Sequence, residues 1–456
     1  MGRICRALFA LVVISILMPI AACQQDNPNW RDEAPGATAI HESLQRITDV
    51  IVHDIFSPPQ AARIYAYAAI SGYEAGRHAD PALLPLAGQI NGLLEVPQPD
   101  AAVDYSYPLA AGIAVLETGK ELIFSEDKVD EFRAELVQRF RETRMPDEIL
   151  SRSVSYGEAV AEAIKGYTGT DNYKQSRTYP KFSITSDESR WRPTPPDYMD
   201  GIEPHWATIR PFVLDSAQQF KPLPPPTFDL TEGSRFHTDL MEVYEALDTD
   251  TEERVAVASF WDCNPFVSHH RGHVMFATKK ISPGGHWMGI AKTVAKSEQL
   301  DFPATIEMYA RVSISLADGF ISCWDEKYRS KLVRPETLIN QFIDEDWQPA
   351  LQTPPFPEYT SGHSVISRAA AVAMTDLFGD NYAYIDSVEV DWGLPAREFE
   401  SFYAASEEAA VSRLYGGIHY GPAIWEGMKQ GQAVGDFVTS NLQTRTQQIS
   451  KAQGSN

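Results

Sequence analysis

Apolar residues recur every three or four positions along most of this chain, which is the spacing of one face of an α-helix. None of the clear segments alternates strictly between apolar and polar residues, as a half-buried strand does. Several segments are rich in alanine with aromatic residues among them, a composition that suits close packing between helices. The pattern predicts an all-α protein with helices over residues 40–56, 61–76, 101–122, 130–140, 148–167, 235–247, 287–296, 305–324, 364–378, 407–414 and 423–442.

One segment interrupts this rhythm. Residues 168–233 contain ten prolines and show little helical periodicity. A linker between two domains is one interpretation of such a segment. Its aromatic residues are unsuited to a solvated tether, however: Trp191, Tyr198, Trp206, Phe212 and Phe220. We therefore predict a Pro-rich extended strap that packs over the helical body.

The size and composition of the chain are those of a large globular protein. It has 456 residues, of which 43% are hydrophobic, and it contains no repeat of fixed period. We expect a single helical domain over residues 30–445, built from one or two bundles. The formal net charge of -23 argues against binding to nucleic acid or to an anionic membrane surface, because both partners require a basic face. Any anion site must be a local basic pocket.

Residues 1–23 have the layout of an export signal, with Arg3 and Arg6, an apolar run over 7–18 and small residues that end at Cys23. The apolar run is too short to span a bilayer comfortably. The last four residues, Ile-Ala-Ala-Cys, resemble the lipobox of bacterial lipoproteins, in which the cysteine is acylated. We expect a lipid anchor at Cys23 and a place in a bacterial cell envelope, at the outer membrane or in the periplasm. Ordinary secretion with a coincidental cysteine is the alternative.

Two cysteines, Cys263 and Cys323, remain in the body of the chain after this segment. Two cysteines cannot form a dense disulfide framework, and no paired-cysteine zinc motif is present. The two side chains can form one bridge or remain as two buried thiols.

Three short segments near the C-terminus each offer groups that suit a tetrahedral oxyanion. The first contains Lys327 and Arg334, which are seven residues apart, so both can point from one face at the end of a helix that stops near Pro335. In the second, Ser361 and Gly362 precede a helical pattern, where a hydroxyl and exposed backbone N–H groups can face an anion. Each segment alone is weak evidence for an anion site, because a lysine and arginine pair is usually solvated and a Ser-Gly-His triplet is usually a turn.

The third segment contains Arg413 and His419, which are six residues apart and would lie on different faces of an uninterrupted helix. Gly416 and Gly417 allow the chain to turn between them, and Pro422 is well placed to begin the next helix. An arginine can hold two oxygens of the anion while the histidine reaches its central atom.

The ordered set Lys-x6-Arg-Pro, Ser-Gly-His and Ser-Arg-x5-His resembles the signature of the type-2 phosphatidic acid phosphatase superfamily, which includes the vanadium-dependent haloperoxidases and some bacterial acid phosphatases. The resemblance covers residues 327–419, and Thr360 stands where a proline usually precedes Ser-Gly-His. It implies a helical-bundle fold and an oxyanion site within residues 324–419. It assigns these residues to the vanadate or phosphate: Lys327, Arg334, Ser361, Gly362, Arg413 and, as the axial group, His419.

The resemblance leaves two chemistries open. In a phosphatase, His419 forms a phosphohistidine, while His363 protonates the leaving group and then activates water. In a haloperoxidase, His419 coordinates vanadium, His363 manages the protons of bound water and peroxide, and Lys327 polarises the peroxide that a halide attacks.

The haloperoxidase interpretation is favoured by the length of the chain and by two aromatic residues. Trp324 lies three residues before Lys327, and Phe356 lies seven before His363, where haloperoxidases place aromatic residues beside the halide. No apolar run beyond the signal is long enough to span a bilayer, which argues against the membrane-embedded branch. We therefore expect a vanadate-dependent enzyme that oxidises a halide, iodide or bromide first, with hydrogen peroxide. An acid phosphatase is the alternative, followed by a non-catalytic surface lipoprotein.

Two further features have more than one interpretation. Asp262 can pair with a pocket arginine, cap a helix or lie on the surface. The histidines at 269, 270 and 273 can bind a divalent metal, but no carboxylate motif accompanies them.

Overall fold

The computed structural model describes residues 26–246, 251–271 and 273–446 of the chain. The predicted signal and its Cys23 lie outside these residues. Most of the described chain is helical, and thirteen of its α-helices are eight residues or longer. These helices are α2 (Gly36–Asp54), α3 (Pro58–Gly76), α4 (Tyr107–Lys120), α5 (Glu126–Glu142), α6 (Asp147–Thr168), α8 (Arg235–Glu245), α9 (Thr251–Phe260), α10 (Pro283–Ser297), α11 (Phe302–Ser330), α12 (Pro335–Phe342), α13 (Gly362–Phe378), α14 (Phe402–Tyr415) and α15 (Gly421–Asn441).

The remaining elements are short. Strands β1 and β2 form one antiparallel hairpin with Val267 opposite Thr278, and β3 and β4 form another with Tyr384 opposite Phe399. The all-α prediction is confirmed in substance, because these hairpins are the only sheets among the described residues. The short elements are α1 (Trp30–Glu33), α7 (Tyr173–Ser176), the 3-10 helices η1 (Arg77–Ala79), η2 (Trp206–Thr208) and η3 (Val388–Trp392), and the strands β1 (Val267–Arg271), β2 (Val274–Thr278), β3 (Tyr384–Asp386) and β4 (Arg397–Phe399).

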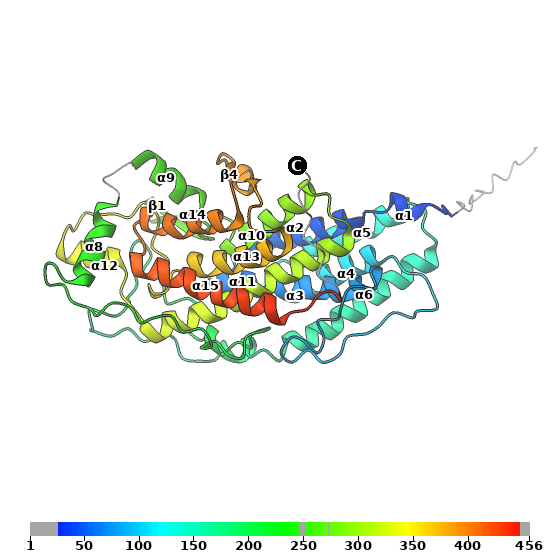
Figure 1. Cartoon of the computed structure of the whole chain (residues 1–456), viewed down its shortest axis with the longest axis horizontal. Helices are drawn as coiled ribbons and strands as arrows, with labels where there is room; N and C mark the ends of the chain where they lie inside the picture. The colour runs from blue at the N-terminus through cyan, green and yellow to red at the C-terminus, as the bar shows by residue number, and fades with distance from the viewer. Residues whose placement is uncertain (1–25, 247–250, 272, 447–456) are drawn as a thin grey trace, which may run out of the picture.

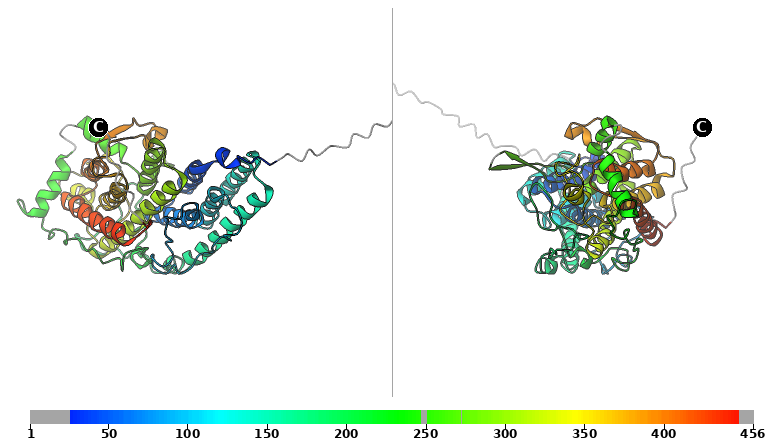
Figure 2. Two further views of the ribbon diagram at one scale, coloured as in Figure 1. Left: turned by 45° about the vertical axis from the view of Figure 1, so that its right-hand side comes forward. Right: turned by 90° about the vertical axis from the view of Figure 1, so that its left-hand side faces the viewer.

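The long helices form two neighbouring groups (Figures 1 and 2). Helices α2 to α6 make one group, and α10, α13, α14 and α15 make the other around α11. Helix α11 is buried along almost its whole length and contacts both α3 and α13, so it joins the two groups. It also ends at the site described below, which gives that site a rigid support.

Small residues let these helices approach closely. A Cβ atom at Gly157 of α6 would lie 2.3 Å from the Ala110 carbonyl oxygen of α4, and one at Gly431 of α15 would lie 2.2 Å from the Val365 carbonyl oxygen of α13. Both distances are far below van der Waals contact, so larger residues would push the helices apart.

The strap prediction is confirmed. Apart from η2, the chain from 177 to 234 has no helix, and it runs along the lower edge of the molecule in Figure 1. The strap is fixed to α11, because the Asp318 carboxylate accepts the backbone N–H groups of three consecutive strap residues at 2.7–3.0 Å. Trp191, Trp206 and Phe212 are buried, whereas Tyr198 is exposed. The strap is therefore part of the packed structure.

The sequence pattern missed α9, α12 and both hairpins, and it extended one helix too far. Helix α11 ends at Ser330, and Lys331 takes a left-handed conformation with φ of 55°. Arg334 is the N-cap residue of α12 instead. The expectation that Lys327 and Arg334 lie on one helix is therefore wrong. Among the described residues, none of the helices combines the length and the apolar character needed to cross a bilayer.

Candidate active site

A cavity of about 190 Å³ lies where the three sequence segments meet. Its walls come from the ends of α11, α13 and α14, from the segment 262–266 that follows α9, and from the strap. The predicted site residues that line it are Trp324, Phe356, Gly362, His363, Arg413 and His419.

Arg334 is fully buried and is held by its surroundings. Its Nε donates to the Phe356 carbonyl at 3.0 Å, and one Nη atom donates to the Ile418 carbonyl at 2.8 Å and lies 3.1 Å from His419 Nε2. Its other nitrogen, Nη2, has no hydrogen-bond partner among the described residues. A buried guanidinium with an unused donor is a natural partner for an anion.

Lys327 is also fully buried. Its ammonium donates to the carbonyl oxygens of Pro357, Glu358 and Thr360 at 2.6–3.0 Å. Burial first, together with the charge of Arg334, lowers the pKa of Lys327 to about 7, although Cys323 acts in the opposite direction. All three donors are used in this arrangement, so the direct contact of Lys327 with an anion stays a prediction.

The Ser-Gly-His segment begins α13, as predicted. Ser361 is the N-cap residue, and its hydroxyl accepts the Ser364 N–H at 3.3 Å. Gly362 is the first residue of the helix and lines the cavity, so the positive end of the helix dipole faces that space. His363 Nε2 is buried without a hydrogen-bond partner in the described chain. Burial first, and then the charge of Arg413, lower the pKa of His363 well below its usual range, so the ring is neutral.

Arg413 enters the cavity from the last turn of α14. Its Nη2 donates to the carbonyl oxygens of Trp261 at 2.8 Å and Ala258 at 3.2 Å, which connects it to α9 and the residue after it. Of the three possibilities for Asp262, the pair with a pocket arginine is not seen among the ion pairs of the described residues. The Asp262 carboxylate lies 2.6 Å from Lys280 Nζ instead.

His419 is oriented by a residue that the sequence analysis did not identify. Its Nδ1 lies 2.7 Å from the Glu358 carboxylate, and the same oxygen accepts the Tyr420 backbone N–H at 3.0 Å. Burial, followed by the charges of Arg334 and Lys327, lowers the pKa of His419 well below its usual range. A neutral ring that donates from Nδ1 to a carboxylate keeps its lone pair on Nε2, which is the form that a metal ligand requires.

The turn that brings His419 to the cavity forms as the two glycines predicted. Helix α14 ends at Tyr415, Gly417 takes a positive φ of 76°, and α15 begins at Gly421 with Pro422 in its first turn. A side chain at Gly417 would be strained there.

The aromatic residues Trp324 and Phe356 lie against each other, with ring centroids 4.9 Å apart, and both line the cavity. The Lys327 ammonium lies 5.0 Å from the Phe356 centroid. The apolar side of the cavity therefore lies next to a basic side chain at these rings. The halide-binding role of the two rings stays a prediction.

The residues around the cavity fit a vanadate ion. Three buried basic residues, Lys327, Arg334 and Arg413, lie around the cavity in this acidic protein. The carboxylate of Glu358 contacts His419, and that of Asp262, which also lines the cavity, pairs with Lys280. The unused donor of Arg334 and the lone pair of His419 Nε2 are the groups that a tetrahedral oxyanion with a metal centre needs. Among the residues that the structure describes, the histidines of the first hairpin form no comparable group. His269 bonds to Thr278, and the His270 side chain lies outside the described residues.

Comparisons with known proteins agree with this geometry. Residues 307–448 match the family model of the second helical-bundle domain of vanadium chloroperoxidase. The crystal structure of the first bacterial vanadium-dependent iodoperoxidase is similar to this chain, with 48% identity over 93% of this chain and 100% of that one and a TM-score of 0.87. A holo-type bacterial vanadium-dependent chloroperoxidase shares the fold at 17% identity, over 85% of this chain and 93% of that one, with a TM-score of 0.64. No curated protein matched the chain.

Proposed function

Because this chain belongs to the vanadium-dependent haloperoxidase family, we propose that iodide is the halide that it oxidises with hydrogen peroxide. The observation that carries this choice is the similarity at 48% identity, over 93% of the chain, to a bacterial iodoperoxidase. Iodide is also the easiest of the three halides to oxidise. In the net reaction, iodide, hydrogen peroxide and a proton give hypoiodous acid and water, so iodide loses two electrons and the peroxide O–O bond accepts them.

The chain's own residues bind and orient the reactants. When vanadate is bound, it supplies a Lewis-acidic centre that activates peroxide. His419 Nε2 would hold this centre, because Glu358 fixes the ring through Nδ1. Arg334, Arg413 and the N-terminus of α13 at Gly362 would hold its oxygens.

His363 is suited to moving protons. Its Nε2 has no hydrogen-bond partner among the described residues, and its lowered pKa keeps the ring neutral, so the ring can exchange a proton with a group in the cavity. The apolar rings of Trp324 and Phe356 exclude water from one wall of the cavity. A weakly hydrated anion such as iodide is better suited to such a wall than a strongly hydrated one.

The test uses the purified protein stripped of vanadate. Oxidation of iodide, bromide and chloride by hydrogen peroxide is measured before and after orthovanadate is added, with p-nitrophenyl phosphate hydrolysis alongside. We expect oxidation of iodide only after vanadate is added, competition by phosphate, and little oxidation of bromide or chloride. Equal rates with iodide and bromide would contradict the choice of iodide. Hydrolysis of the phosphate ester without halide oxidation would contradict the enzyme class.

The lipid anchor at Cys23 is a second proposal, and it places the enzyme in the bacterial cell envelope. It is supported by the basic residues, apolar run and small residues of positions 1–23. Expression in a bacterium with a labelled fatty acid should give labelled protein in the membrane fraction. The Cys23→Ser variant should be unlabelled. Equal labelling of the two proteins would contradict the proposal.

A further inference from the structure

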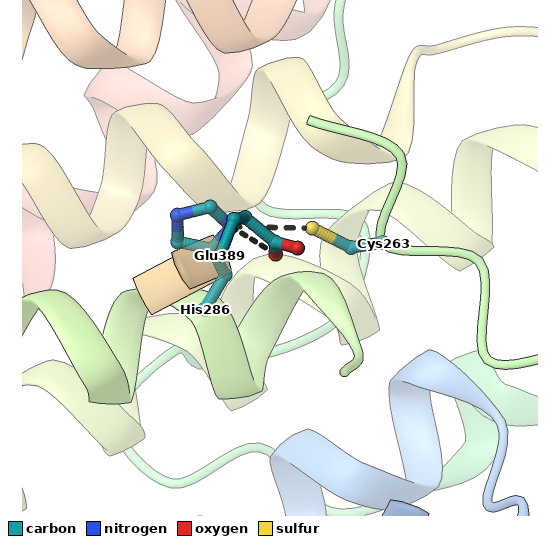
Figure 3. A group of neighbouring side chains, drawn as sticks. All are labelled: Cys263, His286 and Glu389. Atoms are coloured by element: carbon teal, nitrogen blue, oxygen red, sulfur yellow. Dashed lines mark hydrogen bonds and ion pairs between the residues drawn. The ribbon is translucent and has the colours of Figure 1, made fainter. Parts of the chain in front are cut away.

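A second group of potential ligands lies behind the cavity. Cys263, His286 and Glu389 come from three different elements: the segment after α9, the first turn of α10, and η3. Their side chains converge on one point in Figure 3, and each residue is at least 97% buried. One ligand atom of each residue lies within 4.8 Å of the others. The predicted site and the comparisons assign no role to this group.

The imidazole of His286 is fixed in a way that aims Nδ1 at the other two residues. Its Nε2 lies 2.8 Å from the buried carboxylate of Asp386, and that carboxylate also accepts the Val388 backbone N–H. The Trp261 ring stacks on the imidazole with centroids 4.7 Å apart. A carboxylate behind one ring nitrogen is the usual support of a histidine that binds a metal through the other.

The distances suit a small cation. His286 Nδ1 lies 3.4 Å from Cys263 Sγ and 3.2 Å from Glu389 Oε1. For a tetrahedral zinc ion, metal–ligand bonds of about 2.3 Å to sulfur and about 2.0–2.1 Å to nitrogen and oxygen place the ligand atoms about 3.4–3.6 Å apart. Both distances to His286 Nδ1 are therefore within a few tenths of an ångström of those around a tetrahedral zinc ion, and all three ligand atoms lie within 4.8 Å of one another.

Glu389 provides an independent sign that a partner belongs here. Its Oε1 is buried and, despite the nearby Nδ1, has no hydrogen-bond partner among the residues that the structure describes. Burying a carboxylate oxygen without such a partner is costly, and a coordinated cation would remove that cost.

We propose that Cys263, His286 and Glu389 bind a divalent cation, with zinc as the ion that a thiolate, an imidazole and a carboxylate together favour. Binding breaks the S–H bond of Cys263, forms a sulfur–metal bond and releases the proton to solvent. Cys263 also lines the cavity, so the ion can enter from there and a water molecule can take the fourth position. Without a cation, the same distances fit a protonated His286 between the carboxylates of Asp386 and Glu389. Measuring the metal content distinguishes these two states.

The test measures metal content in the full-length protein after equilibration with one equivalent of zinc and removal of the free ion. We expect about one zinc per chain, and a thiolate-to-metal absorption band when cobalt(II) replaces zinc. Glu389→Gln and His286→Gln should each lower zinc affinity by at least tenfold. Cys263→Ser should abolish the cobalt band, whereas Cys323→Ser, which removes the other buried thiol, should keep it.

Absence of stoichiometric zinc from the unaltered protein would overturn the proposal, as would zinc binding that persists in His286→Gln. The near-isosteric Glu389→Gln variant keeps the side-chain volume, so a folded variant is available if His286→Gln does not fold. Measuring vanadium in the same samples shows how much metal occupies the cavity. The proposed zinc site does not depend on which halide the enzyme oxidises.

Discussion

The Glu358 carboxylate lies 2.7 Å from His419 Nδ1 and, through the same oxygen, accepts the Tyr420 backbone N–H. This pair controls which nitrogen of His419 faces the cavity. Because Nδ1 is directed at an acceptor, Nε2 carries the lone pair and lies 3.1 Å from Arg334 Nη1, while Arg334 Nη2 has no hydrogen-bond partner among the described residues. Burial raises the pKa of Glu358 to about 7, although Arg334 and Lys327 act against that rise. The carboxylate therefore has a specific role in the site, although burying its charged form is unfavourable.

Replacing Glu358 with glutamine should weaken vanadate binding by about 10- to 100-fold, the usual effect of removing a residue that supports a metal-binding histidine. The amide keeps an acceptor oxygen but removes the charge that favours the Nδ1–H form. Titration of apoenzyme activity with vanadate measures the change. Glu307→Gln is the matched control, because it removes a buried carboxylate that pairs with Arg445 and Thr444 away from the cavity. Equal weakening in both variants would show a general effect of lost charge.

His419→Ala and His363→Ala should fail in different ways. His419→Ala removes the nitrogen that would bind vanadium and should abolish tight vanadate binding and activity together. His363→Ala removes a proton carrier at the cavity wall, so it should lower kcat by about 100-fold or more while vanadate affinity falls much less. Steady-state kinetics at saturating vanadate, together with equilibrium dialysis, separates the two effects. Full activity in His419→Ala would reject the axial-ligand assignment.

The pKa of Lys327 predicts how vanadate binding depends on pH. Its lowered value of about 7 means that the ammonium form dominates below pH 7 in the empty site and is lost as the pH rises through 7. A bound anion favours the ammonium form, so affinity should decrease above pH 7 by up to about tenfold per pH unit. Lys327→Met lacks this ionisation. The measurement is vanadate affinity from pH 6 to 9 in both proteins. The ionisation of vanadate affects both equally, so the difference between their slopes reports Lys327. Parallel slopes would contradict the prediction.

The strap contributes to stability through Asp318. Replacing Asp318 with asparagine presents an NH₂ group to backbone N–H groups of the strap, so at least one donor loses its acceptor. An unsatisfied buried donor costs about 1–3 kcal/mol, and the free energy of unfolding should decrease by at least that amount. Denaturant unfolding measures it. Asp376→Asn is the control, because this carboxylate pairs with Arg311 and is partly exposed. An equal change in both variants would contradict the special role of the strap contact.

Helical periodicity predicted helices such as α2, which bury one face, and capping residues stabilise the ends of others. Ser361 caps α13 and Ser282 caps α10, for example, and both accept a backbone N–H three residues on. Helix α9 escaped prediction because it is short and begins with charged residues. The hairpins escaped because strands of three to five residues are too short to show an alternating pattern.

The sequence predicted those site residues that belong to a motif. It did not predict contacts between residues that only the fold brings together. The motif identified His419, but its partner Glu358 lies 61 residues away in the chain. Glu358 does stand among prolines and aromatic residues, where an isolated carboxylate is unusual. The spacing of Lys327 and Arg334 indicated convergence, but it could not show that a left-handed residue, Lys331, separates them onto two helices.

The ring of Phe356 should affect the choice of halide more than the binding of vanadate. It lines the cavity beside two basic side chains, with the Lys327 ammonium 5.0 Å and the Arg334 guanidinium carbon 5.1 Å from its centroid. The Phe356 carbonyl that accepts a hydrogen bond from Arg334 is a backbone group, so a substitution of the side chain retains it. Phe356→Leu should therefore keep vanadate affinity within about fivefold, since the lost ring contacts are worth about 0.5–1 kcal/mol.

The same variant opens the cavity to water, so kcat/KM for iodide should decrease at least threefold relative to kcat/KM for bromide. Iodide relies more on an apolar wall because it is the less strongly hydrated anion. Phe378→Leu is the control, since Phe378 packs on Tyr382 and Phe402 and does not line the cavity. An unchanged halide ratio in Phe356→Leu, with vanadate affinity intact, would mean that this ring does not contact the halide.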